Sequence, residues 1–312
     1  MAAANSGVRV LAPAKVNLFL HVGDRREDGY HALQSLVCFS EIGDELRVFP
    51  SDKLSLLQNG EFAGALPPSD GNLVLKAARA FAAAMGRTAS GRFELTKNLP
   101  VASGIGGGSA DAAAVIRALR SVWQSSREGD EILWGQTFAH REESLSAALA
   151  LGSDVPVCLL SAAAWMEGRG ERIWPLADLP DGALVLANPG IAVSTAEVFS
   201  RLERRTGVSE MIHPVCDSVQ ELITYLRAAN NDLEKPALEL APVIGDVLDA
   251  LKGNGALLAR MSGSGATCFG MFEADANAQS AAAAMTRDYP DWWIRATRLA
   301  SRNAGLPRPL IQ

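Results

Sequence analysis

A glycine-rich segment between residues 99 and 119 constrains the fold of this chain more than any other stretch. The segment reads LPVASGIGGGSADAAAVIRAL and has four glycines among residues 104–108. It follows GRFELTKN, which has the residues of a strand. After it, Val115, Leu119 and Val122 recur at helical spacing. The sequence therefore predicts a strand, a glycine loop and a helix in direct succession.

Such an arrangement is a common way to bind an anion. Successive backbone N–H groups form a concave surface, the helix N-terminus adds partial positive charge, and glycine lets the backbone approach closely. Neither of the two familiar nucleotide loops fits, because no lysine precedes Ser109 and Ser109 stands where a dinucleotide loop has its third glycine. A tight turn that packs the helix on the strand would need only one glycine. Four glycines therefore favour phosphate binding.

Two charged residues lie in apolar surroundings far apart in the sequence. Lys15 is in APAKVNLFL, and lysine is almost never fully buried unless it is paired. The alternative is a lysine at a strand edge with its ammonium group in solvent. Asp154 is in LGSDVPVCLL, between a predicted helix and a predicted strand, where the alternative is a turn aspartate that accepts from local N–H groups. An ion pair would give each a partner, and the sequence leaves this open.

Two further features have a functional and a structural interpretation. The segment MSGSGATCF, residues 261–269, predicts either a β-hairpin turn or a second phosphate contact, and its glycines would let it approach the first loop. Tyr30 and His31 follow an Asp-Gly turn signal. Aromatic rings near a polar site stack on a nucleotide base, whereas the alternative is a core tyrosine beside a surface histidine.

Composition narrows the class of partner. The formal net charge is −6, which does not favour a nucleic-acid-binding protein. The four cysteines are far apart with no CxxC pair, which indicates reduced thiols in the cytoplasm. The four histidines are scattered, and the apolar runs are too short to cross a bilayer. We expect a cytoplasmic protein that acts on a small molecule rather than on nucleic acid or a membrane.

Predicted helices and strands alternate along the chain without a strict βαβ rhythm. This pattern is typical of an α+β protein, and we interpret it as two lobes. The expected N-terminal lobe spans residues 1–165 and the C-terminal lobe residues 166–312. The polar stretch 124–143 is expected to be a surface excursion between helices.

The motifs PAKVNLFLHV, DGYHALQSL, LPVASGIGGGSADAA, LGSDVPV, NDLE and SGSGATCF occur in this order. Together they resemble the small-molecule kinases of the galactokinase, homoserine kinase, mevalonate kinase and phosphomevalonate kinase (GHMP) superfamily, from about residue 8 to residue 300. The resemblance implies a ribosomal-protein-like N-terminal lobe and a ferredoxin-like C-terminal lobe. It also implies ATP and Mg²⁺ as cofactors. The reaction that it implies is phosphorylation of the C2 hydroxyl of a diphosphocytidyl methylerythritol, a step of the non-mevalonate isoprenoid pathway.

The same resemblance assigns roles by position in the motifs. Lys15 and Asp154 match the catalytic pair, in which Asp154 orients the hydroxyl and accepts its proton late, while Lys15 stabilises the oxygen. Ser109 is a candidate Mg²⁺ ligand. The phosphate loop corresponds to Pro100, Val101, Ala102, Ser103, Gly104, Ile105, Gly106, Gly107, Gly108, Ser109 and Ala110.

The substrate side is assigned in the same way. Asn17, Tyr30 and His31 match the residues that hold the cytidine diphosphate alcohol. Phe199, in STAEVF, matches an aromatic residue that encloses the cytosine together with the ring of His31.

Three alternatives remain open. Another kinase of the superfamily would act on mevalonate or homoserine, and DGYH beside PAKVNLFL argues against it. A non-catalytic nucleotide-binding protein is disfavoured because Lys15 and Asp154 are both present. A nicotinamide-dependent oxidoreductase is disfavoured by the missing third glycine.

Overall fold

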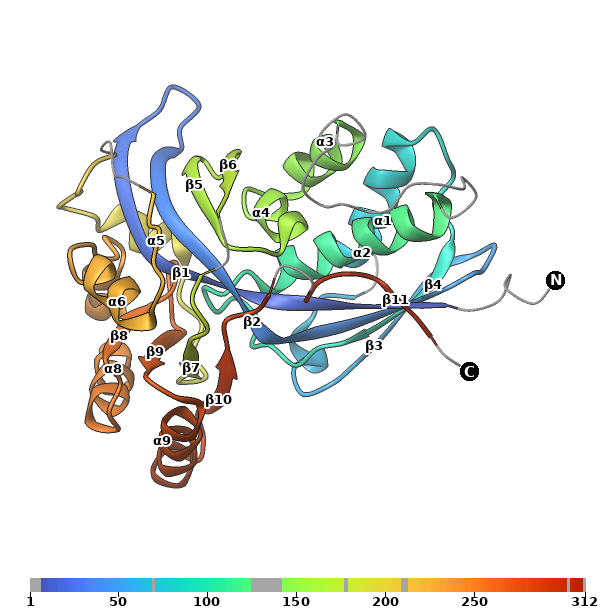
Figure 1. Cartoon of the computed structure of the whole chain (residues 1–312). Helices are drawn as coiled ribbons and strands as arrows, with labels where there is room; N and C mark the ends of the chain where they lie inside the picture. Colours follow the sequence, from blue (N-terminus) through green and yellow to red (C-terminus); the bar gives the residue numbers. More distant parts are fainter. Residues whose placement is uncertain are drawn as a thin grey trace.

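Two long antiparallel strands connect the two halves of the molecule. The computed structural model describes residues 7–68, 71–124, 142–176, 179–208, 213–301 and 304–310. Strand β1 (Val8–Arg25) pairs with β2 (His31–Phe49), and the register shifts between Pro13 and Lys15 and again between Asn17 and Phe19. Figure 1 shows both strands running from one lobe into the other. Side chains on β1 can therefore contact residues of both lobes.

The first sheet has seven strands among the described residues. Its main path runs β11-β1-β2-β4-β3, and β5 pairs with both β2 and β6. Strand β4 runs parallel to β3 and antiparallel to β2, and its last residue, Thr96, pairs with Glu45 of β2. The remaining strands of this sheet are β3 (Leu54–Asn59), β4 (Gly91–Thr96), β5 (Ala164–Gly168), β6 (Arg172–Pro175) and β11 (Arg308–Pro309).

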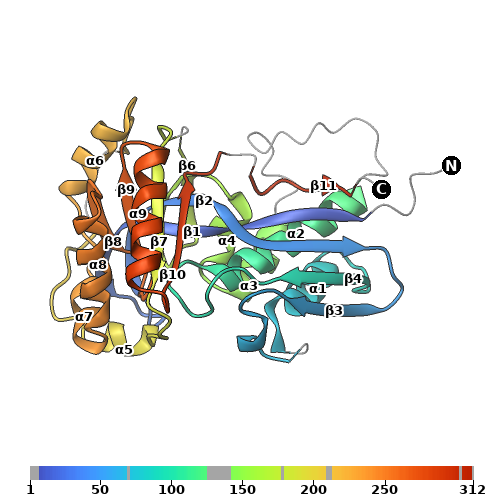
Figure 2. The same cartoon turned by 90° about the horizontal axis from the view of Figure 1, so that it is seen from below.

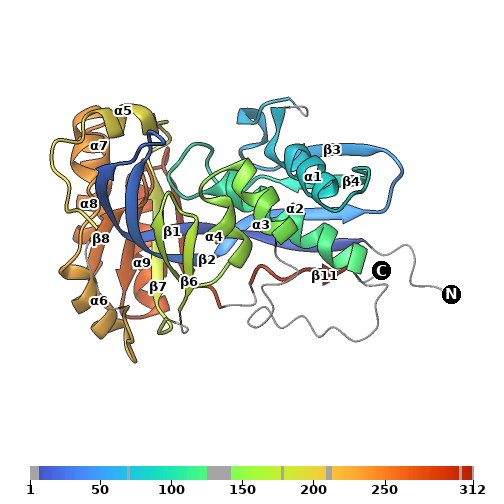
Figure 3. The same ribbon diagram turned by 90° about the horizontal axis from the view of Figure 1, so that it is seen from above.

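Four helices lie on one side of this sheet, as Figures 1 and 3 show. Asn72 caps the first of them by accepting from the N–H of Val74 (2.8 Å), and Gly86, with φ +64°, follows its end as the sequence predicts. The second begins directly at the glycine loop and buries its alanine-rich face in the hydrophobic core between the helices and this sheet. These helices are α1 (Leu73–Ala84), α2 (Gly107–Gln124), α3 (Glu142–Leu151) and α4 (Val155–Leu160); a short 3-10 turn, Ala63–Ala65, precedes them.

The second sheet has the order β10-β7-β9-β8, with all pairs antiparallel. Its strands are β7 (Ala183–Asn188), β8 (Leu258–Met261), β9 (Cys268–Phe272) and β10 (Trp293–Arg298). Helices α8 (Val243–Gly253) and α9 (Asp275–Asp288) cover one face of it, as Figure 2 shows. The other helices of this lobe are α5 (Thr195–Ser200), α6 (Val219–Arg227) and α7 (Glu234–Leu240).

The predicted α+β fold with two lobes is confirmed, and two local predictions are wrong. The segment SDVPVCLL forms helix α4 rather than a strand, because Pro156 lies in its first turn, where a missing N–H costs nothing. The segment PALELAPVIGDVLDALK, whose sequence predicts one helix, forms two helices, since Pro242 provides no N–H for a continuous ladder.

The expected surface excursion lies largely outside the described residues, since 125–141 are not among them. The boundary near residue 165 stays a prediction, and we propose that it falls later. Strands β5 and β6 pair within the first sheet, and the second sheet begins with β7 at Ala183. Among the described residues, no helix is both long and apolar enough to span a membrane.

Candidate active site

Lys15 and Asp154 meet, although 138 residues separate them in the chain. The Lys15 ammonium donates to Asp154 Oδ2 at 2.7 Å. The lysine side chain is 4% exposed, whereas that of Asp154 is 34% exposed. Asp154 is the N-cap residue of α4, but its side chain accepts no capping hydrogen bond. The alternative of a turn aspartate bound to local N–H groups is therefore wrong, and so is that of a lysine with its head in solvent.

Lys15 also contacts the glycine loop. Its backbone N–H donates to the carbonyl of Ile105 at 2.9 Å. A Cβ placed on Gly106 would lie 3.3 Å from Cβ of Lys15 and 3.4 Å from its Cε. The loop thus lies directly against the lysine stem, and the ion pair is next to the loop.

Backbone conformation and packing also require glycine at several positions of the loop, apart from any contact with phosphate. Gly104 and Gly106 have φ values of +78° and +64°, a region that favours glycine. A Cβ on Gly104 would lie 2.5 Å from the carbonyl oxygen of Ser262, and one on Gly107 would lie 3.2 Å from Nζ of Lys97. The argument that one glycine would satisfy packing is therefore wrong, because at least three of these positions are crowded or left-handed.

The free N–H groups of the loop are stronger evidence for anion binding than its glycines. The N–H groups of residues 104–109 donate no hydrogen bond within the described part of the chain. The last three belong to the first turn of α2, where helix geometry leaves N–H groups without an intrahelical partner. A row of free N–H groups at the start of an 18-residue helix is suited to hold phosphate oxygens.

The second glycine loop is the turn of the β8–β9 hairpin, as predicted. It packs on the first loop, because Ser262 Oγ donates to the carbonyl of Gly104 (3.1 Å) and the Thr267 N–H donates to that of Ser103 (3.0 Å). Asn231, in the NDLE motif, donates its amide to the carbonyls of Met261 (2.9 Å) and Gly263 (2.8 Å). The hairpin loop therefore supports the first loop from the C-terminal lobe.

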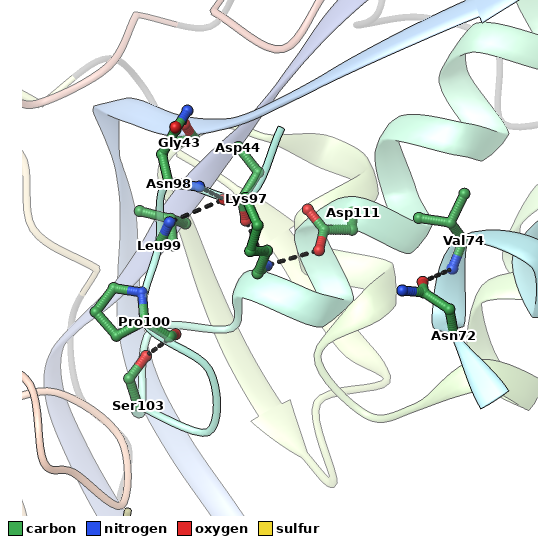
Figure 4. A network of polar contacts seen from close by, with 10 residues as sticks. All are labelled: Gly43, Asp44, Asn72, Val74, Lys97, Asn98, Leu99, Pro100, Ser103 and Asp111. Atoms are coloured by element: carbon green, nitrogen blue, oxygen red, sulfur yellow. Dashed lines mark hydrogen bonds and ion pairs between the residues drawn. The ribbon is translucent and has the colours of Figure 1, made fainter. Parts of the chain in front are cut away.

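A second lysine–aspartate group lies on the other side of the glycine loop, and Figure 4 shows it. Lys97 donates to Asp44 (2.5 Å) and to Asp111 (2.7 Å), and all three side chains are at most 3% exposed. Asp44 also accepts from the backbone N–H groups of Asn98 (2.6 Å) and Leu99 (2.9 Å). We call these three residues the Lys97 cluster. It joins β2, the entry to the loop and the first turns of α2.

Burial dominates the electrostatics of the Lys97 cluster. Removal from water raises the pKa of Asp111 to about 8, against the opposing effect of the Lys97 ammonium. The carboxylates, in turn, raise the pKa of Lys97 despite its own desolvation. Our reading of the sequence missed this cluster. Its one signal was a lysine between a strand and the glycine loop.

Asn17 is buried with one free polar atom. Ser35 Oγ donates to the carbonyl of Phe19 (2.5 Å), so it can only accept from the Asn17 amide nitrogen (2.8 Å). This fixes the orientation of the amide and leaves Oδ1 of Asn17 without a partner among the described residues. A Cβ on Gly263 would lie 3.5 Å from that oxygen, which places it beside the second glycine loop.

The structure brings His31 and Phe199 together. Their rings are stacked with centroids 5.6 Å apart and an interplanar angle of 19°. Nδ1 of His31 donates to the carbonyl of Gly23 (3.2 Å), which leaves Nε2 as an acceptor in the neutral ring. Tyr30 is 56% exposed, and the Arg169 guanidinium lies over its ring at 5.1 Å. The alternative of a core tyrosine is therefore wrong.

Comparisons with known proteins show the family to which this chain belongs. The model for the GHMP kinases N terminal domain matches residues 72–162, and the model for GHMP kinases C terminal matches residues 217–291. The first match contains the glycine loop and Asp154, and the second contains the hairpin loop. Lys15, His31 and Phe199 lie outside both matched ranges.

Relatives match more of the chain than these two domains. The 4-diphosphocytidyl-2-C-methyl-D-erythritol kinase of Parvibaculum lavamentivorans is 49% identical over 287 residues, 91% of this chain and 95% of the relative. The protein of the same name from Cereibacter sphaeroides is 48% identical and covers 93% and 98% of the two chains. A solved 4-(cytidine 5'-diphospho)-2C-methyl-D-erythritol kinase superposes with a TM-score of 0.71 at 34% identity, over 94% of this chain and all of that one.

Proposed function

Because this chain belongs to the 4-diphosphocytidyl-2-C-methyl-D-erythritol kinases, within the GHMP kinases, we propose that Lys15, Asp154 and the glycine loop form its phosphoryl-transfer site. The chain is an ATP-dependent kinase of isoprenoid biosynthesis that acts on this diphosphocytidyl alcohol. The C2 hydroxyl of the methylerythritol is the proposed acceptor. The observation that carries the proposal is the position of Lys15, whose backbone binds the loop and whose ammonium binds Asp154.

Asp154 orients the acceptor hydroxyl. Its Oδ2 is occupied by Lys15, while Oδ1 has no partner among the described residues and the side chain is partly exposed. A carboxylate beside an ammonium is a weak base, so it accepts the proton late, as the new O–P bond forms and the bond to ADP breaks. Lys15 stabilises the negative charge that develops on the reacting oxygens.

The free N–H groups of residues 104–109 bind the phosphates of ATP. The loop is held on both sides, by the Lys97 cluster and by the hairpin loop of residues 262–266. Because its amides are oriented before the nucleotide arrives, little reorganisation accompanies binding. Holding the phosphates in line with the hydroxyl is the main part of catalysis in a loose transition state.

The residues present fit Mg²⁺ bound with ATP. No three His, Cys, Asp or Glu side chains form a metal-binding group in the described ranges, so a dedicated protein cage is lacking there. Mg²⁺ at phosphoryl-transfer sites instead takes one or two protein oxygens together with phosphates and water. Ser109, whose hydroxyl forms no hydrogen bond to the described residues, and Asp154 would supply these oxygens. When bound, the ion neutralises charge on the phosphates.

The cytosine end of the substrate lies between His31 and Phe199. The stacked rings form a planar slot that widens to admit a base, and Tyr30 lies beside it in sequence with its ring exposed. Oδ1 of Asn17 is an acceptor for a hydroxyl of the methylerythritol moiety.

We further propose that the enzyme works in the cytoplasm and binds no nucleic acid. All four cysteines are free, and Cys38, Cys158 and Cys268 are buried. Burial raises the pKa of Cys158 to about 12, so this thiol is neutral and inert at physiological pH. Reduced, unreactive thiols suit a reducing compartment.

A panel of alcohols with ATP tests the proposed substrate. The purified enzyme should release ADP with the diphosphocytidyl alcohol and far less with mevalonate or homoserine. The control is the same assay without an acceptor. Equal ADP release with all acceptors, or none above the control, would contradict the proposed substrate.

A further inference from the structure

Arg117 connects the two elements that carry the ion pair of the active site. It lies on α2 and is completely buried. One of its amino groups, Nη1, donates to the carbonyl of Cys158 (2.6 Å) and to Ser161 Oγ (2.8 Å), at the end of α4. The other, Nη2, donates to the carbonyl of Leu11 (3.0 Å), on β1. Asp154 is the N-cap of that same helix, and Lys15 lies on that same strand, four residues after Leu11.

The acceptors of Arg117 are all neutral. Its three hydrogen bonds go to two carbonyls and a hydroxyl, and Nε has no partner among the described residues. Burial lowers the pKa of Arg117 to about 10, so the side chain keeps its charge at neutral pH. A buried charge without a counter-ion is costly. Removal of the side chain would in turn leave the buried carbonyls of Cys158 and Leu11 without this donor.

Helix α4 is held by the burial of Val155, Val157 and Cys158, and Arg117 adds polar contacts at its end. It has six residues, too few to be stable alone, and the Asp154 side chain gives it no capping bond. Ser161, at its end, has a left-handed backbone with φ +48° and donates its hydroxyl to the carbonyl of Cys158. Arg117 donates to the carbonyl of Cys158 and to the hydroxyl of Ser161. These bonds hold the C-terminal end of the helix, while Asp154 is at its N-terminal end.

We propose that Arg117 is a positioning residue for phosphoryl transfer, because its guanidinium holds α4 against β1 and so sets the contact between Asp154 and Lys15. The proposal rests on the role of Asp154 given above. A misplacement of about 1 Å at a reacting group costs on the order of 100-fold in rate. Loss of the guanidinium should therefore lower turnover without removing any group that touches the substrates.

The C-terminal segment encloses the guanidinium and offers a second way to disturb it. A Cβ on Gly305 would lie 2.8 Å from Ser161 Oγ and 3.1 Å from the Cζ of Arg117. Gly305→Val therefore pushes on this group of contacts without changing its charge. Its effect should have the same direction as that of Arg117→Met and be smaller.

Arg260 is a matched control. It is also buried, on β8, and donates to three carbonyls, those of Leu18 (2.7 Å), Leu226 (3.0 Å) and Ala229 (2.7 Å). One of these is on β1, but none is on α4. A variant of Arg260 should cost similar stability and leave the ion pair in place.

The experiment compares Arg117→Met, Arg117→Lys and Gly305→Val with Arg260→Met and Arg260→Lys. We expect Arg117→Met to lower kcat by about 10- to 100-fold with the KM values of ATP and alcohol nearly unchanged. Arg117→Lys, which keeps the charge but cannot reach both elements as a fork, should fall between it and the wild type. The Arg260 variants should keep kcat near the wild-type value at an equal loss of melting temperature. Equal kcat losses in the matched Arg117 and Arg260 variants, or a loss seen only in KM, would overturn the proposal.

A double-mutant cycle separates this inference from the function on which it rests. If Arg117 acts through Asp154, Arg117→Lys should reduce turnover much less in an Asp154→Asn background than in the wild type. If Arg117→Lys lowered turnover by the same factor in both backgrounds, the positioning role would be overturned and the kinase assignment would stand. Normal turnover of Asp154→Asn alone would instead contradict the role of Asp154. The cycle uses the lysine variant, so it stays informative if Arg117→Met does not fold.

Discussion

Two lysine–aspartate groups flank the same glycine loop, and they differ in access to solvent. The Lys97 cluster is closed, with one ammonium between two carboxylates that are both at most 3% exposed. The Lys15–Asp154 pair is open on one side, since its carboxylate is 34% exposed and keeps one oxygen free of partners among the described residues. The same residue types therefore occur in two opposite settings about the loop.

The difference indicates that the closed cluster supports the loop, whereas the open pair can take part in the reaction. In the Lys97 cluster, Asp44 binds the N–H groups of Asn98 and Leu99, so the charges are used to fix the entry to the loop. In the open pair, the free oxygen of Asp154 can receive a proton from a ligand. We conclude that burial and the number of unused hydrogen-bonding atoms, more than residue type, distinguish a supporting ion pair from a reacting one.

The largest expected effect is on turnover in the open pair. Asp154→Asn keeps the shape of the side chain but removes the proton acceptor, so kcat should fall by about 10²- to 10⁴-fold. Steady-state kinetics with both substrates measures this. The control is Asp249→Asn, which changes an exposed aspartate that is also paired with a lysine, Lys252. Near-normal turnover of the Asp154 variant, with an unchanged melting temperature, would remove Asp154 from the mechanism.

The next effect, on stability, distinguishes the two lysines. Lys97→Met leaves the buried carboxyl groups of Asp44 and Asp111 without their ammonium partner, which should lower the free energy of unfolding by about 3–5 kcal/mol. Lys15→Met leaves Asp154 with access to water, so its main loss should be in turnover. Urea unfolding of both variants tests the contrast. Equal losses of stability in the two would show that the open pair is as structural as the closed one.

The sequence predicted the open pair better than the closed cluster, and the reason is physical. Lys15 and Asp154 lie in distinctive apolar motifs, and a buried lysine demands a partner. Asp44 and Asp111 lie in segments that look like an ordinary strand and an ordinary helix. They meet Lys97 only because β4 pairs with β2 and α2 packs on β2. Such a meeting depends on tertiary structure, which local patterns do not encode.

The same distinction applies to the fold. The strand before the glycine loop, the loop itself and the helix after it were predicted from residue preference and periodicity, since these signals act within a few residues. Helix α4 was predicted as a strand because VPVCLL is apolar throughout and has no periodicity. Strands β3, β5 and β6 were missed, and each of them is paired to a strand distant in sequence or lies at the edge of the sheet.

A smaller effect tests which side of the open pair the alcohol occupies. His31→Ala removes one ring of the stacked slot, so the KM of the diphosphocytidyl alcohol should rise. Base stacking is worth about 1–3 kcal/mol, which corresponds to roughly 5- to 150-fold. Tyr30→Ala should act in the same direction. If both variants raised only the KM of ATP, the assignment of the two substrates to the two sides would be reversed.

The last expected effect concerns the pH dependence of the closed cluster. The folded chain raises the pKa of Asp111 from 3.8 to about 8, so Asp111 binds its proton more tightly when folded than when unfolded. Its contribution to stability is therefore full below pH 4, declines as the unfolded carboxylate ionises, and is lost once the pH has risen through about 8. Asp111→Asn cannot ionise and should flatten this decline, so the stability of the variant relative to the wild type should increase between pH 5 and 8. Melting temperatures of both proteins over that range measure it, with Asp249→Asn as the exposed control. Parallel pH profiles for the wild type and the Asp111 variant would show that burial does not hold a proton in the cluster, and the contrast between a closed and an open group would then rest on geometry alone.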